Sequence, residues 1–163
     1  MRIELRSVTA DQTRAVGEAL APCFVPRDAV ALTGELGAGK TTLVQGIARG
    51  LGVTDQVVSP TFTLVREYHG STMDIAHVDV YRLERVQDVM DLGLDELGDG
   101  EAVLLVEWGD AVEALLPADH LTIELTTTST DTDERTIVLT PTGPSWEERA
   151  DRLGLALTAW RRP

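Results

Sequence analysis

Residues 34–41 read Gly-Glu-Leu-Gly-Ala-Gly-Lys-Thr, and this octet constrains the fold more than any other part of the chain. Its glycines let the backbone wrap closely around phosphate oxygens, and the turn points successive N–H groups inward as an anion-binding nest. The octet follows the apolar run 29–33 and opens a stretch of helical spacing at Lys40, whose helix N-terminus also favours an anion. A glycine-rich turn that arose by chance would not be expected to lie between a buried strand and a helix. Strand, loop and helix in this order therefore predict a phosphate-binding loop (Walker A).

The rest of the chain divides into short apolar runs and stretches of helical spacing. These patterns predict strands at 3–8, 29–33, 62–68, 75–81, 102–106, 121–126 and 136–140, and helices at 11–21, 40–49, 86–92, 110–116 and 146–160. A short polar link between the third and fourth strands predicts an antiparallel hairpin among crossover units. We therefore expect an α/β fold, a three-layer P-loop NTPase-like domain with a mixed central sheet. The length of 163 residues fits one domain over 1–163, with 144–163 as a C-terminal helical extension.

Composition narrows the possible partners. The chain carries 27 acidic and 14 basic residues, a formal charge of −13, which repels nucleic acid phosphates at long range. Contact with RNA is therefore expected through a partner, although solubility is the plainer explanation of the charge itself. No apolar run approaches the roughly 18–20 residues of a membrane span. The single cysteine, Cys23, argues against a disulfide framework and a cysteine-built zinc site, and a cytoplasmic protein is the simplest interpretation.

The loop predicts ATP and Mg²⁺ as cofactors. Lys40 is expected to reach the β- and γ-phosphates, and the Thr41 hydroxyl is expected to ligate the metal. We also expect Lys40 to be solvent-accessible without nucleotide. A second acidic group normally holds Mg²⁺ from the end of a neighbouring strand, and Glu107 follows the apolar run 103–106 in this way. The alternative for Glu107 is an ordinary surface glutamate after a strand.

Asp79 is a second acidic candidate. Alternation along its strand places His77, Asp79 and Tyr81 on one face, which indicates either a wall of the site or a solvated strand face. In a site, Asp79 would position the attacking water or bind a magnesium-bound water. Thr61 is a candidate sensor of the γ-phosphate by analogy with the switch threonines of GTPases, and a plain loop is the alternative there.

Two functions lack a convincing residue. Arg82 follows the strand of Asp79 and would either turn toward the phosphate or pair with surface carboxylates, so no arginine finger is identified. A missing finger would go with slow hydrolysis by the protein alone and activation by a partner. Residues 9–13 and Arg135 are only weak candidates for the adenine pocket.

The remaining motifs gain meaning when they are taken together with the loop. They are the loop with the next threonine at 34–42, Ser-Pro-Thr-Phe-Thr-Leu-Val at 59–65, Glu-Tyr at 67–68, His-Val-Asp-Val-Tyr-Arg-Leu at 77–83, Leu-Gly-Leu at 92–94 and Val-Glu-Trp at 106–108. In this order they resemble the TsaE family, formerly YjeE, and they cover most of residues 7–140. Walker A alone is shared by many families, whereas the other segments together are far more specific.

The resemblance implies an ATPase of bacterial tRNA threonylcarbamoyladenosine synthesis. Members of the family hydrolyse ATP weakly alone and are activated by the TsaB–TsaD pair, in which TsaD transfers the threonylcarbamoyl group to adenosine 37 of tRNA. TsaE is thought to drive turnover or resetting of that complex. The implied partners are therefore TsaD and TsaB, with tRNA contacted only indirectly and no membrane involved.

It also implies roles for the residues that match the motifs. The phosphate-binding positions would be Gly37, Ala38, Gly39, Lys40, Thr41 and Thr42. Thr41 and Glu107 would hold Mg²⁺, and Lys40, Asp79 and Glu107 would be the catalytic positions. Trp108 would anchor the partner surface or would simply be a packed aromatic residue.

Two other functions stay open from the residues alone. Many P-loop proteins of this size are small-molecule kinases, which need an acceptor pocket, usually a mobile lid and often several arginines on the phosphates. We find no arginine cluster of that kind between the two acidic positions. A nucleotide-gated binding module with negligible turnover is the other alternative.

Overall fold

The structure is a computed structural model that describes residues 1–60, 64–80, 86–91, 93, 96, 100–107, 116–129 and 131–163. Its elements are, in chain order, β1 (Ile3–Ser7), α1 (Ala10–Leu20), η1 (Ala21–Cys23), β2 (Ala29–Thr33), α2 (Lys40–Gly50), β3 (Val65–Tyr68), β4 (Ile75–Asp79), α3 (Val86–Met90), β5 (Val103–Glu107), β6 (His120–Thr127), β7 (Arg135–Thr142), α4 (Pro144–Glu148), α5 (Ala150–Ala156) and η5 (Thr158–Trp160). The bounds of β2 match the sequence prediction, and those of α2 differ from it by one residue.

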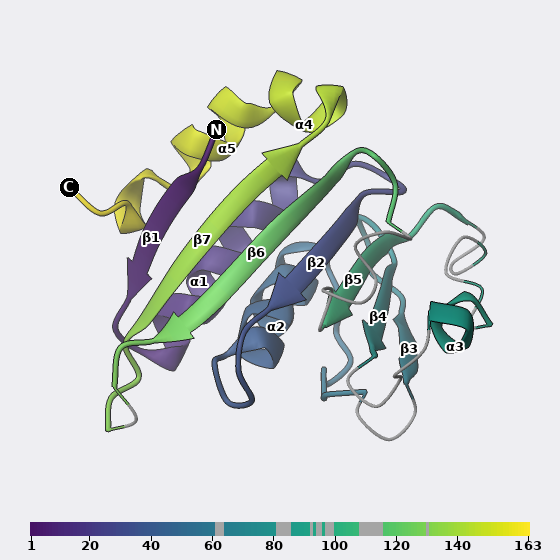
Figure 1. Cartoon of the computed structure of the whole chain (residues 1–163), viewed down its shortest axis with the longest axis horizontal. Helices are drawn as coiled ribbons and strands as arrows, with labels where there is room; N and C mark the ends of the chain where they lie inside the picture. The colour runs from purple at the N-terminus through teal and green to yellow at the C-terminus, as the bar shows by residue number, and fades with distance from the viewer. Residues whose placement is uncertain are drawn as a thin grey trace.

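The described strands form one seven-stranded sheet in the order β1-β7-β6-β2-β5-β4-β3 (Figure 1). Strand β2 lies at its centre and pairs in parallel with β5 and β6, and β5 pairs in parallel with β4. The outer pairs β1–β7, β6–β7 and β3–β4 are antiparallel. The predicted hairpin and the mixed α/β sheet are therefore confirmed.

Helices α1 and α2 lie together on one face of the sheet, behind it in the view of Figure 1. Two glycines let the helix backbones meet. A Cβ atom at Gly46 would lie 2.0 Å from the carbonyl oxygen of Arg14, and one at Gly17 would lie 2.4 Å from that of Leu43. This close packing fixes the helix that begins at the phosphate loop against the rest of the core.

The core lies on both faces of β2, as expected for a central parallel strand. Val30 and Leu32 belong to the large cluster beneath α1 and α2, whereas Ala29 and Ala31 face a smaller cluster. The smaller cluster also contains Val78, Val80, Val106 and Leu116. The apolar run that predicted this strand is thus explained by burial on both sides.

The single helix predicted over 146–160 is wrong. The chain forms α4, α5 and the turn η5, and it leaves helical geometry at Arg149 (φ −95°, ψ 0°). In this conformation the Arg149 guanidinium is held by Ser145 and by Asp28, which lies next to β2. Trp146 remains buried in the large cluster, so the segment packs as part of the core.

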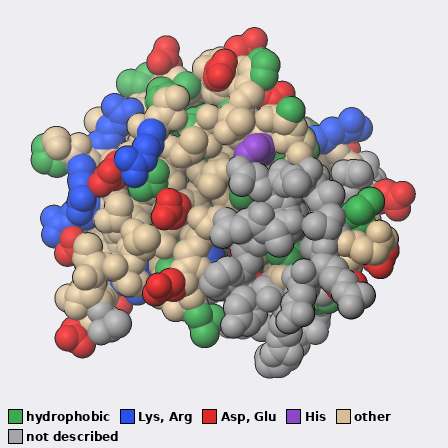
Figure 2. All heavy atoms as spheres, viewed as in Figure 1, with side chains coloured by type: hydrophobic (Ala, Val, Ile, Leu, Met, Phe, Trp, Pro, Cys, Tyr) green, Lys and Arg blue, Asp and Glu red, His purple; other side chains and the backbone are tan. Residues whose placement is uncertain are grey.

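Figure 2 shows the face of the molecule that is seen in Figure 1, and acidic side chains are spread over its coloured part. Basic side chains gather there mainly at the edge where Figure 1 places β1 and the C-terminus. Within the described part of the chain, no helix combines the length and the apolar character that a bilayer crossing requires. The helix predicted at 110–116 lies, except for Leu116, outside the described residues.

Candidate nucleotide site

The phosphate loop joins the end of β2 to the start of α2 and needs glycine at defined points. Gly34 has φ +141°, and a Cβ atom there would lie 2.4 Å from the carbonyl oxygen of Leu125 on β6. Gly39 caps α2 in the left-handed conformation (φ +103°). Since other residues rarely adopt these angles, the glycine pattern of the sequence reports this local geometry directly.

Lys40 is buried, with 6% of its surface exposed, so the prediction of an accessible lysine is wrong. Its Nζ donates to the carbonyl oxygens of Gly34 (2.7 Å) and Glu35 (3.1 Å), which belong to the same loop. Burial lowers the pKa of Lys40, and the nearby carboxylates of Glu107 and Asp79 oppose this shift. The ammonium group is thus held against the loop by two of the loop's own carbonyl oxygens.

The two predicted carboxylates meet at one edge of the sheet. Strands β4 and β5 run in parallel with Asp79 opposite Glu107, and Glu107 is in turn opposite Leu32 of β2. Glu107 is 3% exposed and Asp79 is 5% exposed. The alternatives of a surface glutamate and of a solvated strand face do not fit this burial.

Glu107 is also joined to the start of the phosphate-loop helix. The Thr41 hydroxyl donates to its Oε1 atom at 3.2 Å. A cavity of about 190 Å³ opens above this pair and is lined by Leu36, Gly37, Gly39, Lys40, Thr41, Thr42, Ser59, Asp79 and Glu107. The structure thus brings the predicted phosphate, metal and catalytic candidates to one cavity, apart from Ala38, which is buried in the loop itself.

The donor chemistry of this cavity fits Mg²⁺ bound together with phosphates. Among the described residues no three His, Cys, Asp or Glu side chains gather as a metal site. Mg²⁺ is usually held by only one or two carboxylates, with substrate phosphates and water completing the octahedron. A hydroxyl and a carboxylate oxygen in contact, as in Thr41 and Glu107, are hard oxygen donors of the required kind.

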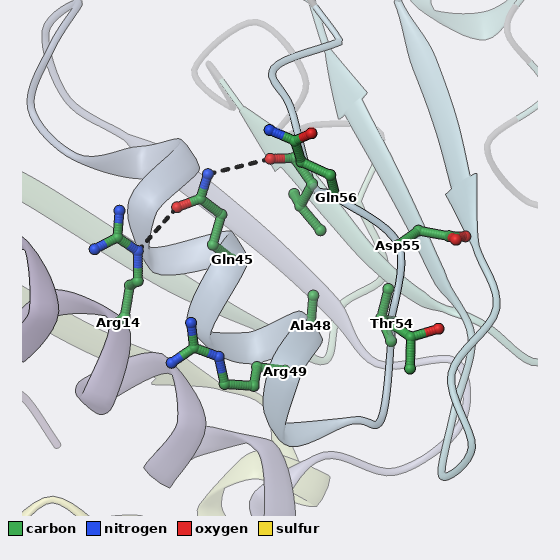
Figure 3. A pocket seen from close by; sticks show the side chains of 9 residues that line it. Arg14, Gln45, Ala48, Arg49, Thr54, Asp55 and Gln56 are labelled. Carbon is green, nitrogen blue, oxygen red and sulfur yellow. Dashed lines mark hydrogen bonds between the residues drawn. The ribbon is translucent and has the colours of Figure 1, made fainter.

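Ser59 reaches the cavity on a segment that α2 holds in place. Gln45 of α2 accepts a hydrogen bond from Arg14 Nε (3.0 Å) and donates to the carbonyl oxygen of Val57 (3.1 Å) (Figure 3). The Tyr68 hydroxyl contacts the backbone of Val58 on the other side. Helix α2 therefore carries the phosphate loop at its start and also positions the segment that leads into the site.

A larger hollow of about 270 Å³ lies away from the phosphate loop, between α1, α2 and residues 53–57 (Figure 3). Its two arginines, Arg14 and Arg49, pair with the surface carboxylates of Asp11 and Glu18. It holds none of the predicted site residues. Size alone is therefore a poor guide, and the smaller cavity with the convergent polar groups is the candidate site.

Two residues near the site were underrated or missed from the sequence. Arg135, a weak candidate for the adenine pocket, donates from Nε to Ala38 O (2.9 Å) and from Nη2 to Gly37 O (3.4 Å), so it braces the phosphate loop. His77 was placed on the face of Asp79 without a role, and its Nε2 lies 3.2 Å from Glu107 Oε2. Alternation along β4 and the segment His-Val-Asp-Val-Tyr-Arg-Leu at 77–83 both include His77 but give it no role, and no local pattern links Arg135 to the loop.

Other candidates are placed or remain outside the described part. Residues 9–13, the other weak candidate for the adenine pocket, border the phosphate loop. The Cγ2 atom of Thr13 lies 3.9 Å from the place that a Cβ atom would take at Gly39. Thr61, Arg82 and Trp108 lie outside the described residues.

Comparison with known proteins identifies the family of the chain. The family model "Threonylcarbamoyl adenosine biosynthesis protein TsaE" matches residues 7–137. The TsaE protein of Bacillus subtilis is 40% identical over 152 residues, 93% of this chain and 94% of that protein. TsaE of Treponema pallidum is 40% identical over 119 residues, 73% of this chain and 87% of that protein.

A solved structure shows the same architecture. The crystal structure of Bacillus subtilis YdiB superposes with a TM-score of 0.80 at 36% identity and covers 95% of each chain. The α/β fold of the P-loop NTPase kind is therefore confirmed. The family match and these relatives together show that the chain belongs to the TsaE family, whose members take part in tRNA threonylcarbamoyladenosine biosynthesis.

Proposed function

We propose that this protein binds ATP with Mg²⁺ and hydrolyses it as a component of the tRNA threonylcarbamoyladenosine machinery, acting on the TsaB–TsaD complex to support its turnover. The observation that carries the proposal is the contact between Thr41, at the start of the phosphate-loop helix, and Glu107, at the end of a neighbouring parallel strand. That pairing is what a phosphate loop requires to hold a nucleotide-bound metal.

In this proposal the loop from Gly37 to Thr42 binds the phosphates through its inward N–H groups and the N-terminus of α2. Lys40 exchanges the carbonyl oxygens of Gly34 and Glu35 for the β- and γ-phosphate oxygens. The exchange needs only a short movement because its Nζ already lies within the loop.

Thr41 and Glu107 would hold Mg²⁺, which supplies positive charge at the phosphate oxygens when it is bound. Asp79 lies beside Glu107 in the register of β4 and β5. As a buried carboxylate in the same cavity, it would accept a hydrogen bond from the attacking water and orient it toward the γ-phosphate, or hold a water of the metal. In either role an Asp79 oxygen atom accepts a hydrogen bond from a water molecule.

Partner stimulation follows from the charges in the cavity. Among its described lining residues, Lys40 is the single cationic side chain. A transition state with charge on several phosphate oxygens gains about 10³–10⁵-fold in rate from an added arginine in other P-loop enzymes. Slow hydrolysis by the protein alone, accelerated by the TsaB–TsaD pair, is therefore expected.

We further propose that tRNA is reached only through that pair. The formal charge of −13 opposes direct contact with a polyanion. A tRNA-modification protein with this charge would reach tRNA most simply by binding a partner protein. We place this function in the cytoplasm.

Lys40→Ala tests the proposal, with Arg162→Ala as a control because that surface arginine pairs with Glu4 and does not line the cavity. ADP affinity and ATP turnover are measured with and without purified TsaB–TsaD from the same organism. Loss of the charge-assisted phosphate contacts should weaken binding roughly ten- to hundredfold. Wild-type turnover by a folded Lys40→Ala protein would refute the proposal.

The same assay separates the alternatives. Turnover of the wild-type protein should rise when TsaB–TsaD is added, and tRNA binding by the isolated protein should be weak. Nucleotide-dependent partner binding without turnover would favour a nucleotide-gated module. Transfer of phosphate to a small acceptor would favour a kinase.

A further inference from the structure

His77 is an unexplained polar group in the middle of β4. Its side chain is 0% exposed, and both ring nitrogens lack a directed hydrogen bond among the described residues. Buried polar atoms are nearly always hydrogen-bonded, because leaving one unsatisfied costs free energy. An apolar side chain would fill this position without that cost, so the imidazole calls for an explanation other than packing.

The imidazole lies against one oxygen of Glu107. His77 Nε2 is 3.2 Å from Oε2, while the other oxygen, Oε1, accepts the hydrogen bond of Thr41. The contact with His77 is short enough for a hydrogen bond but is not aligned as one. Two donors from separate elements, β4 and the start of α2, thus approach the two oxygens of a single buried carboxylate.

We propose that His77 is a positioning residue for Glu107: its Nε2–H donates to Oε2 and fixes the carboxylate plane, so that Oε1 stays on the Thr41 side for the metal. The proposal rests on the function above, in which Thr41 and Glu107 hold Mg²⁺. Functional hydrogen bonds are often poorly aligned in ligand-free structures and tighten when the ligand binds. Hydrogen bonds to metal-ligating groups commonly change metal affinity about 10- to 100-fold.

A structural role in the core makes different predictions. If His77 only fills space, its replacement should lower stability and leave metal affinity unchanged in the folded protein. As a positioning residue, it should lose metal affinity when the donor at Nε2 is removed, whether or not the melting temperature changes. The two roles therefore differ in the metal affinity of the folded variants.

Three variants of His77 distinguish the effect of its N–H donor from the effect of the space that its side chain fills. His77→Gln keeps an N–H near the place of Nε2, His77→Asn carries its amide near the place of Nδ1, and His77→Leu has no donor. Mn²⁺ binding is followed by electron paramagnetic resonance in the presence of ADP. ADP affinity is measured separately in EDTA, so that metal and nucleotide binding are distinguished.

We expect His77→Leu and His77→Asn to weaken Mn²⁺ binding roughly 10- to 100-fold and His77→Gln to stay within about threefold of the wild type. ADP affinity in EDTA should be equal in all four proteins. Wild-type Mn²⁺ affinity in His77→Asn or His77→Leu would overturn the inference, and so would an equal loss in the Gln and Asn variants. If His77→Leu does not fold, the Gln and Asn pair still decides.

Failure of the underlying function gives a separate result. If the wild-type protein binds ADP but takes up no Mn²⁺ with it, the metal site proposed for Thr41 and Glu107 is refuted, and the role of His77 falls with it. If wild-type metal binding is normal and the variants are unaffected, only the role of His77 is refuted.

Discussion

Replacing Arg149 by methionine tests whether the C-terminal segment is tied to the strand that feeds the phosphate loop. The Arg149 guanidinium donates to Asp28 at 2.6 and 2.8 Å and to the carbonyl oxygen of Cys23 at 2.9 Å. It also lies 4.0 Å from the ring centroid of Trp146. The two charged side chains are only 12% and 7% exposed, and β2 begins at the residue after Asp28.

Removing one partner of such a buried pair leaves the other charge uncompensated, which costs about 3–5 kcal/mol. For a domain of this size, each kcal/mol lowers the melting temperature by about 2–4 °C. Arg149→Met should therefore lower the melting temperature by about 6–20 °C. The melting temperature of Arg149→Lys should lie between those of the wild type and Arg149→Met, since a lysine keeps the charge but cannot make the two-pronged contact.

Thermal and urea denaturation of the purified variants measure the effect. Arg162→Ala is the matched control, because its pair with Glu4 leaves the two side chains 42% and 34% exposed. An exposed pair of this kind contributes at most about 1 kcal/mol. If Arg149→Met is no less stable than Arg162→Ala, the tie between the C-terminal segment and β2 does not stabilise the fold as argued.

Three further predictions address the loop and its helix. In Gly46→Ala the new Cβ atom would lie 2.0 Å from the carbonyl oxygen of Arg14, so α1 and α2 must separate. The free energy of unfolding, measured in urea, should fall by about 1–3 kcal/mol. An unchanged midpoint of urea unfolding would contradict this packing. Lys40 is the only lysine, so NMR of ¹³C-methylated protein should give its pKa below the ordinary value, and Glu107→Gln should lower it further; a pKa at or above the ordinary value would contradict the burial. Because the unfolded chain then binds the proton more tightly, this group should make stability rise with pH between the lowered and the ordinary pKa. Arg135→Gln removes donors to two loop carbonyls and should weaken ADP binding roughly tenfold by calorimetry, and wild-type affinity would show that the brace is dispensable.

Local chemistry explains why much of the site could be predicted from the sequence. A continuous apolar run followed by glycines leaves few alternatives to a buried strand and a phosphate loop, and β2 occupies the predicted residues. Glu107 was expected at the carboxyl end of its strand, where ligands bind in open α/β sheets. The parallel pairing of β4 with β5 then brings Asp79 opposite it.

The features that could not be predicted depend on residues far apart in the chain. Arg135 contacts Ala38 across 97 positions, and Arg149 contacts Asp28 across 121. The second contact holds the guanidinium of Arg149, the residue at which the C-terminal helix is interrupted. Helical periodicity in the sequence carries no signal of this contact. The burial of Lys40 was missed for a different reason, because accessibility depends on how the loop closes around its own carbonyl oxygens.

The charge balance of the cavity connects the metal to the nucleotide. Its described lining holds one cationic side chain, Lys40, and two carboxylates, Asp79 and Glu107, so their formal sum is −1. A nucleotide brings several more negative charges into a cavity whose acidic groups are already buried. The loop N–H groups and the end of α2 offset part of this repulsion, and a divalent cation on Thr41 and Glu107 offsets more. In the proposed function, metal and nucleotide therefore bind as one unit, and a residue that positions Glu107 acts on both.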